Sequence, residues 1–262
     1  MTQKERRLQI KARAKKQLKQ SSSNPYLATL VFGLINFLML IIFEVYMVCA
    51  LGLSNFLGNE DYIGLNVYTA FQIIISIISL LLMNGFMWYC LKVYRGEQNS
   101  IKDIFNGFSK KGLKLFLITL IEGLLSFIVM IILCVPMFII LFITKDNSAI
   151  FLIVFLLIYA LMFIALLYIS YSFRMTCYII YDNDLGIIDI IKLSFKIMKG
   201  HKWELFKLDM TLIGWVLLIL ITFYIAGIYV FPYVWTVSAG FYEEIKNENS
   251  IETINGEIIE KL

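Results

Sequence analysis

Charged residues are scarce in this sequence, and so are the side chains that enzymes most often use. Asp, Glu, Lys and Arg make up 16% of the 262 residues, against about a quarter in soluble domains. There is one histidine, while hydrophobic residues account for 60% and the mean hydropathy is +0.80. This composition excludes an ordinary soluble domain and predicts a protein with several membrane-spanning helices.

Patterns typical of catalytic, nucleotide-binding and metal sites are also missing. His201 has no second histidine with which to form a zinc site. The sequence contains neither a G-x-x-x-x-G-K-[ST] phosphate loop nor a G-x-S-x-G nucleophile turn. The cysteines lie singly in apolar stretches, without a C-x-x-C pair: Cys49, Cys90, Cys134 and Cys177. We therefore predict no metal, no cofactor and no enzymatic activity, and we interpret His201 as an imidazole at a membrane interface.

Long apolar runs are what the sequence does contain. Four of them are long enough to cross ~30 Å of hydrocarbon at ~1.5 Å per residue: 26–53, 67–91, 113–142 and 149–173. The last run, 205–242, would span about 57 Å as one helix, so it must be divided. We place the break between Thr222 and Gly227. The prediction is an all-α polytopic membrane protein with six transmembrane helices.

The basic residues predict the orientation of these helices. With six crossings, Lys145 is the only one of the 23 Lys and Arg residues on the outer side. Lys and Arg are enriched in cytoplasmic loops. Both termini are thus expected in the cytoplasm, in a multi-pass protein of the cytoplasmic membrane. The chain is predicted to consist of a basic cytoplasmic segment (1–25), a membrane domain (26–242) and a cytoplasmic tail (243–262).

An amphipathic stretch precedes a predicted crossing in each longer cytoplasmic loop. In 187–199 the polar residues fall on one helical stripe: Asp189, Lys192, Lys196 and Lys199. We expect Lys192, Lys196 and Lys199 to contact anionic lipid headgroups at the cytoplasmic face. Ile188, Ile191 and Phe195 are expected to point to acyl chains or to the helix bundle.

A shorter amphipathic stretch, 101–111, carries its apolar residues at Ile104, Phe105 and Phe108. The two loops match at a spacing of 87 to 88 residues, and each contains a K-G-x-K pattern, at 111–114 and 199–202. With the basic N-terminal segment as a first copy, this favours three repeated units, each an interfacial helix followed by a helical hairpin. The alternative is that basic, amphipathic loops are simply common in membrane proteins.

The C-terminal third carries a more specific pattern: Met198-Lys199-Gly200, Gly214-Trp215, Pro232-Tyr233, Thr236, Ala239 and Phe241-Tyr242. Together with Ala14 and Leu18-Lys19 near the start, it resembles the bacterial integral-membrane family catalogued as domain of unknown function 975. The turn at 222–227 has less glycine than is usual there. The resemblance implies a six-helix bacterial membrane protein without an assigned activity.

Charged residues inside the apolar runs are the remaining candidates for a site, because each is costly in lipid unless it is paired or hydrated. Glu122 is the deepest, and Asn36 and Asn84 could be its hydrogen-bonding partners in an intramembrane polar site. The alternative is that Glu122 only contributes to packing. Three others lie nearer the ends of their runs, where pairing or hydration is expected: Glu44, Arg174 and Asp209.

These observations favour a non-enzymatic protein that acts through protein or lipid partners in envelope assembly, secretion or self-protection. The expected partners are membrane lipids and a membrane protein, and nothing indicates a nucleic acid. The alternative is a gradient-driven transporter or exporter of a lipid-like or amphiphilic compound, favoured by the repeat and by Glu122.

Overall fold

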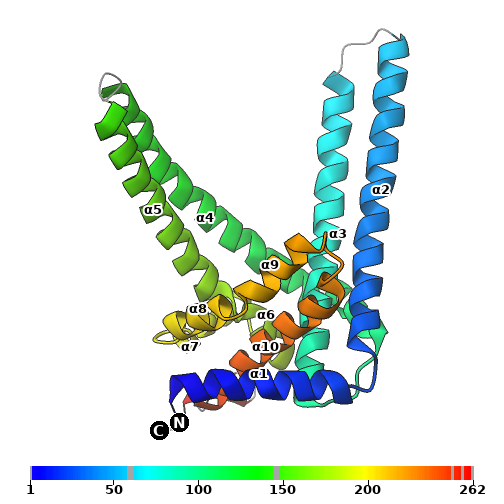
Figure 1. Ribbon diagram of the computed structural model, residues 1–262, viewed down its shortest axis with the longest axis vertical. Coiled ribbons are helices and arrows are strands. Elements are labelled where there is room, and N and C mark those ends of the chain that lie inside the picture. The colour runs from blue at the N-terminus through cyan, green and yellow to red at the C-terminus, as the bar shows by residue number, and fades with distance from the viewer. Residues whose placement is uncertain (1, 58–61, 144–147, 249–250, 255–256, 261–262) are drawn as a thin grey trace. The chain divides into compact units, whose positions relative to one another are not determined.

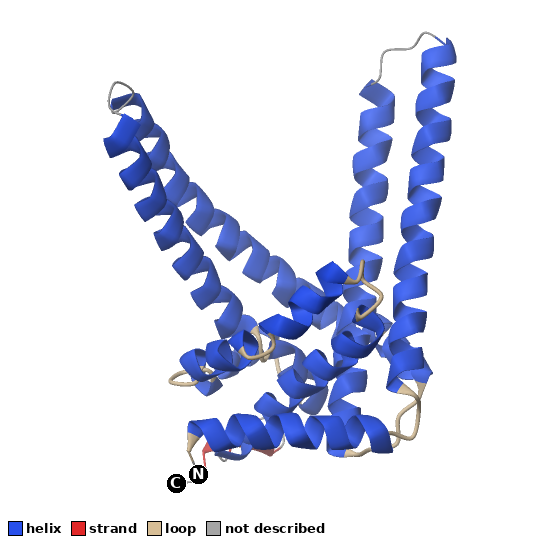
Figure 2. Ribbon diagram, in the orientation of Figure 1, coloured by secondary structure: helices blue, strands red, loops and turns tan. Residues whose placement is uncertain are grey.

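Helices make up nearly all of the described chain (Figure 2). The computed structural model describes residues 2–57, 62–143, 148–248, 251–254 and 257–260. Lys145, used above to predict the outer side, lies outside these residues. The elements, labelled in Figure 1, are α1 (Gln3–Gln20), α2 (Pro25–Leu57), α3 (Tyr62–Arg95), the 3-10 helix η1 (Ile101–Phe108), α4 (Lys110–Ile143), α5 (Ser148–Phe173), α6 (Thr176–Asp182), α7 (Ile187–Ile197), α8 (Lys202–Met210), α9 (Ile213–Ile221), α10 (Gly227–Glu248), β1 (Ile251–Ile254) and β2 (Glu257–Glu260).

Four helical stretches are long enough and apolar enough to span a membrane: Pro25–Cys49, Thr69–Arg95, Lys110–Met137 and Leu152–Asp182. They coincide with the first four predicted crossings, for which the sequence prediction is confirmed at the level of length and composition. The fifth and sixth crossings are not among these four stretches and stay predictions. The nine residues of α9 extend only about 14 Å, and α10 contains Pro232. The predicted break between Thr222 and Gly227 is confirmed.

The chain divides into two compact units, which are described separately. The first contains residues 1–113 and 211–243, and the second contains residues 114–210 and 244–262. The helices α1, α2, α3, η1 and α9 belong to the first unit, together with most of α10. Most of α4, with α5 to α8, belongs to the second.

In the first unit, α1 is an amphipathic helix that starts at a capping box formed by Thr2 and Glu5. Its buried residues recur at every fourth position: Ile10, Ala14 and Leu18. On its polar face, partial burial and the charges of Arg7 and Lys15 lower the pKa of Lys11. This dense positive face matches the predicted basic N-terminal helix.

The 3-10 helix η1 packs tightly on α3. A Cβ atom at Gly85 would overlap the carbonyl oxygen of Ile104, and one at Gly107 would overlap that of Leu81. Only glycine allows the two backbones to approach so closely. Of the three apolar residues of the predicted amphipathic stretch, Ile104 is buried, whereas Phe105 and Phe108 are exposed.

In the second unit, α7 packs on the end of α5. The Ser194 hydroxyl donates to the Ser172 carbonyl oxygen at 2.6 Å, and the rings of Phe173 and Phe195 meet edge to face at 5.3 Å. Within the predicted tail, 243–262, α10 continues to Glu248 and is followed by the antiparallel pair β1 and β2.

The threefold repeat stays a prediction. A helix followed by a long hairpin occurs twice, as α1 with α2 and α3, and as η1 with α4 and α5. The third occurrence, α7 followed by α8, α9 and α10, consists of shorter helices.

Candidate functional site

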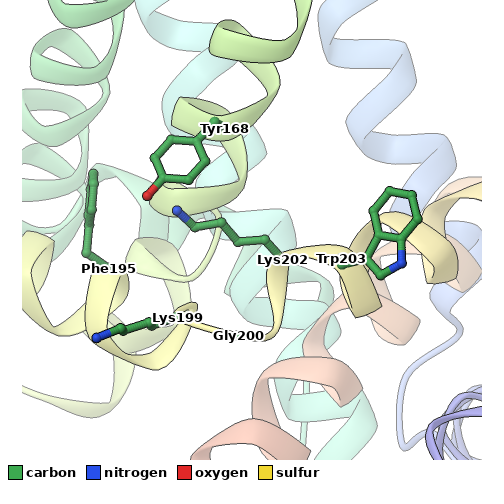
Figure 3. Close-up of a pocket in the computed structure, with 6 residues that line it drawn as sticks. All are labelled: Tyr168, Phe195, Lys199, Gly200, Lys202 and Trp203. Atoms are coloured by element: carbon green, nitrogen blue, oxygen red, sulfur yellow. The ribbon is translucent and has the colours of Figure 1, made fainter.

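A pocket of about 500 Å³ opens where α5, α7 and α8 meet in the second unit (Figure 3). Its residues come from all three helices and from the α7–α8 connection: Tyr168, Phe195, Lys199, Gly200, Lys202 and Trp203. Gly200 has a φ of 87°, a left-handed conformation that glycine adopts without strain. This turn places Lys199 and the first turn of α8 at one pocket.

Aromatic rings hold the Lys202 ammonium group in this pocket. Its Nζ atom lies 3.2 Å from the ring centroid of Tyr168, toward which the side chain extends in Figure 3, and 5.7 Å from that of Phe195. Such cation–π contacts are favourable in partly desolvated sites. Lys199 supplies a second positive charge, and the N-terminal end of α8 adds a partial one. The pocket is therefore suited to an anionic group.

A second pocket, of about 480 Å³, adjoins the first and shares Tyr168, Lys202 and Trp203 with it. The rest of its lining is apolar or aromatic: Phe163, Ile164, Leu167, Tyr171 and Phe206. Trp203 stacks on Phe206 at 5.0 Å, and Tyr171 meets the same ring edge to face at 6.4 Å. One half of the combined site thus offers positive charge, and the other offers a hydrocarbon surface.

A cluster of charged side chains lies beside the apolar pocket. The charge of Arg174, at the end of α5, acts on both Glu122 of α4 and Asp209 of α8. The Tyr171 hydroxyl donates to Asp209 Oδ2 at 3.1 Å. Asp209 lies outside the four membrane-length helices, and burial raises the pKa of its carboxyl group, although Arg174 and Tyr171 oppose this effect. Two carboxyl groups thus share one guanidinium group.

The predicted lysines are exposed, Lys192 and Lys196 on α7 and Lys199 just after its end. Of these three, only Lys199 lines the pocket. Ile188 is 66% exposed, while Ile191 and Phe195 are half-buried, so their orientation toward acyl chains or the bundle stays a prediction. The buried apolar residues of α7 are Ile190, Leu193 and Ile197.

The predicted polar set does not form one site within either unit. Asn36 and Asn84 belong to the first unit and Glu122 to the second. Asn36 donates to the Phe32 carbonyl oxygen of its own helix at 2.8 Å. The amide nitrogen of Asn84 is buried without a hydrogen-bond partner among the described residues. Within the second unit, the charge of Arg174 acts on Glu122, as it does on Asp209.

His201 lies 3.8 Å from the buried Glu204 carboxylate, measured from Nδ1 to Oε2. In the described part of the chain, no three His, Cys, Asp or Glu side chains are grouped so that they could hold a metal ion.

Sequence reasoning missed the pocket residues Tyr168 and Lys202. The K-G-x-K pattern, which includes Lys202, was the available signal, but nothing in the sequence linked it to Tyr168.

Comparison with known proteins identifies the family. The model of the family described as protein of unknown function (DUF975) matches residues 1–249. No curated protein and no solved structure matches the chain. Since the match covers nearly the whole sequence, the chain belongs to this family, as its C-terminal motifs had indicated.

Proposed function

We propose that this is a non-enzymatic, multi-pass protein of the bacterial cytoplasmic membrane that acts by binding an anionic amphiphile, in envelope assembly, secretion or self-protection. The observation that carries the proposal is the pair of adjoining pockets joined at Lys202. A membrane-protein partner is compatible with this role. In the proposed arrangement both termini face the cytoplasm, where anionic lipids attract basic segments.

The two halves of the site match the two parts of a lipid. A phosphate or carboxylate group would lie between Lys199 and Lys202, where ionic hydrogen bonds are strong. An acyl chain would lie along Phe163, Ile164 and Phe206, where it buries apolar surface at about 25 cal/mol per Å². Neither half alone distinguishes an amphiphile from a simple anion or from a neutral lipid.

Replacing both pocket lysines, Lys199→Gln with Lys202→Gln, is expected to lower the retention of anionic lipid in the purified protein. Each lysine near a lipid surface contributes ~1 kcal/mol, so the affinity should fall by about tenfold or more. Native mass spectrometry with added phosphatidylglycerol and phosphatidylcholine measures the change.

The matched control is Lys192→Gln with Lys196→Gln, which removes the same charge from the exposed face of α7 outside the pocket. The proposal predicts a clearly smaller loss for this pair. Equal losses for the two pairs would show that general surface charge attracts the lipid and that the pocket has no special role.

Transport is a second candidate function, favoured by the position of Glu122 in a membrane-length helix beside Arg174. A carrier coupled to protons or cations needs a titratable group of this kind. If the protein is such a carrier, proteoliposomes should move a fluorescent phosphatidylglycerol across the bilayer when a pH gradient is applied, and Glu122→Gln should abolish the movement. Movement no faster than in protein-free vesicles would exclude the carrier and favour the binding role.

A further inference from the structure

The helices α9 and α10 form a short hairpin whose tip is apolar and exposed. At the tip, Phe223 is 88% exposed and Ile221 is 74% exposed. Most of α9 is exposed as well, although all nine of its residues are glycine, tryptophan or aliphatic. No charged residue occurs between Asp209 and Glu243. Such a surface is unfavourable in water and suited to hydrocarbon.

The backbone N–H groups of the turn are satisfied without water. All nine N–H groups from Thr222 to Val230 donate a hydrogen bond within the hairpin, eight of them to backbone carbonyl oxygens. The ninth, that of Ala226, donates to the Thr222 hydroxyl oxygen at 3.1 Å. A loop in water does not need internal acceptors for its N–H groups, because water can accept their hydrogen bonds. A turn in lipid must satisfy its N–H groups internally.

The backbone conformation of the turn is unusual for the residues that form it. Phe223 and Tyr224 have φ values of 48° and 67°, in the left-handed region that side chains with a Cβ atom disfavour. Glycine would be the usual residue at such positions. Two aromatic residues occupy these positions instead, and the side chains of both are exposed.

The neighbouring helix α2 indicates how far the tip reaches. The rings of Tyr26 and Tyr229 lie 5.0 Å apart, at the start of α2. Tyr224 and Phe231 line a groove with α2 residues that extend no further than Phe37. Phe37 is about 18 Å along α2 from Pro25, at ~1.5 Å per residue, which is little more than half of a ~30 Å hydrocarbon core.

The other end of α10 returns to the side on which α2 begins. The Nζ atom of Lys15 in α1 lies 5.7 Å from the ring centroid of Tyr233. Further along, Arg95, the last residue of α3, forms an ion pair with Glu243. The end of α3 and the start of α2 lie on one side of this helical pair, close to α10 and α1 (Figure 1). The ring of Trp215, near the start of α9, lies 6.0 Å from that of Tyr233. The hairpin therefore enters and leaves on the same side.

We propose that α9 and α10 form a re-entrant hairpin, whose tip at Phe223–Ile225 inserts among the acyl chains to about the middle of the bilayer without crossing it. The protein then crosses the membrane four times. The even number of crossings still leaves both termini on the same side, in agreement with the distribution of Lys and Arg residues.

Spin labelling in lipid vesicles tests the insertion depth. Cys90 and Cys177 are buried, so only Cys49 and Cys134 need to be replaced by alanine before new cysteines are introduced. Labels are placed at Phe223→Cys and Ile225→Cys. Phe37→Cys, on an exposed position of α2, is the lipid control, and Gln98→Cys, in the exposed connection after α3, is the water control.

Both tip labels should collide with oxygen and be shielded from a water-soluble nickel complex, as the Phe37 label is. Accessibility to nickel like that of the Gln98 label would overturn the proposal, because the tip would then be in water, either outside the membrane or on the far side after a full crossing. Phe223→Trp, in a protein whose four native tryptophans are replaced by phenylalanine, provides a second measurement. Its fluorescence should be quenched most by lipids brominated deep in the acyl chain, and strongest quenching by shallow bromines would also contradict insertion to the middle.

Discussion

Replacing Gly85 by alanine is expected to destabilise the protein by about 3 kcal/mol, at the upper end of the usual cost of overpacking. The new Cβ atom would overlap the backbone carbonyl oxygen of Ile104. A flexible side chain could move aside, but η1 is held by its capping box at Ser100 and by the ion pair of Lys92 with Asp103 at 3.0 Å. Reversible unfolding in mixed detergent micelles measures the loss.

The control is Gly33→Ala in α2, where no atom lies within 4 Å of the added Cβ. Alanine is favoured over glycine inside a helix by up to ~1 kcal/mol, so this variant should be as stable as the parent protein or more so. If both variants unfold alike, the close packing of η1 on α3 is not what stabilises the first unit.

The variant Arg174→Gln should lower the free energy of unfolding by about 2 to 3 kcal/mol, somewhat less than the loss of a fully buried partner would. It would leave the carboxyl groups of Glu122 and Asp209 without the cation they share. Neutralising both in the same protein, with Glu122→Gln and Asp209→Asn, should recover part of the loss because no uncompensated charge then remains.

An exposed ion pair in the same unit serves as the comparison. Lys114 contacts Asp184 at 2.6 Å, with both side chains more than one-third exposed. Lys114→Gln should cost less than ~1 kcal/mol. If Arg174→Gln cost no more than this, or if neutralising the two acids gave no recovery, the three residues would not form a coupled cluster.

The sequence was informative where a local pattern determines the outcome. Long apolar runs predicted four helices of membrane-spanning length, and the stripe of Asp189, Lys192, Lys196 and Lys199 predicted the polar face of α7, which is exposed. The weaker helical propensity around Thr222 and Gly227 located the turn between α9 and α10. Each of these features depends on residues that are close in the chain.

Contacts between distant segments could not be predicted in this way. Glu122, Arg174 and Asp209 were each singled out as ionisable residues in or at the ends of apolar runs, yet no local pattern placed them together. The same holds for the contact of Lys202 with Tyr168, which joins α8 to α5. Hydropathy favoured a complete crossing for α9 and α10, because it measures only apolar content. The re-entrant hairpin proposed above rests instead on contacts of α10 with α1, α2 and α3, which hydropathy does not report.

We propose that an anionic lipid occupies the joined pockets of the second unit. Photo-cross-linking tests this proposal most directly, with a phosphatidylglycerol that carries a photoreactive diazirine in its acyl chain. The cross-linked peptides are mapped by mass spectrometry. We predict adducts concentrated on Phe163–Tyr171 of α5 and on Phe206 of α8, and fewer of them from a phosphatidylcholine probe of the same chain length. Adducts spread evenly over the exposed faces of α2, α4 and α5, or equal labelling by the two probes, would contradict a specific anionic-lipid site in these pockets.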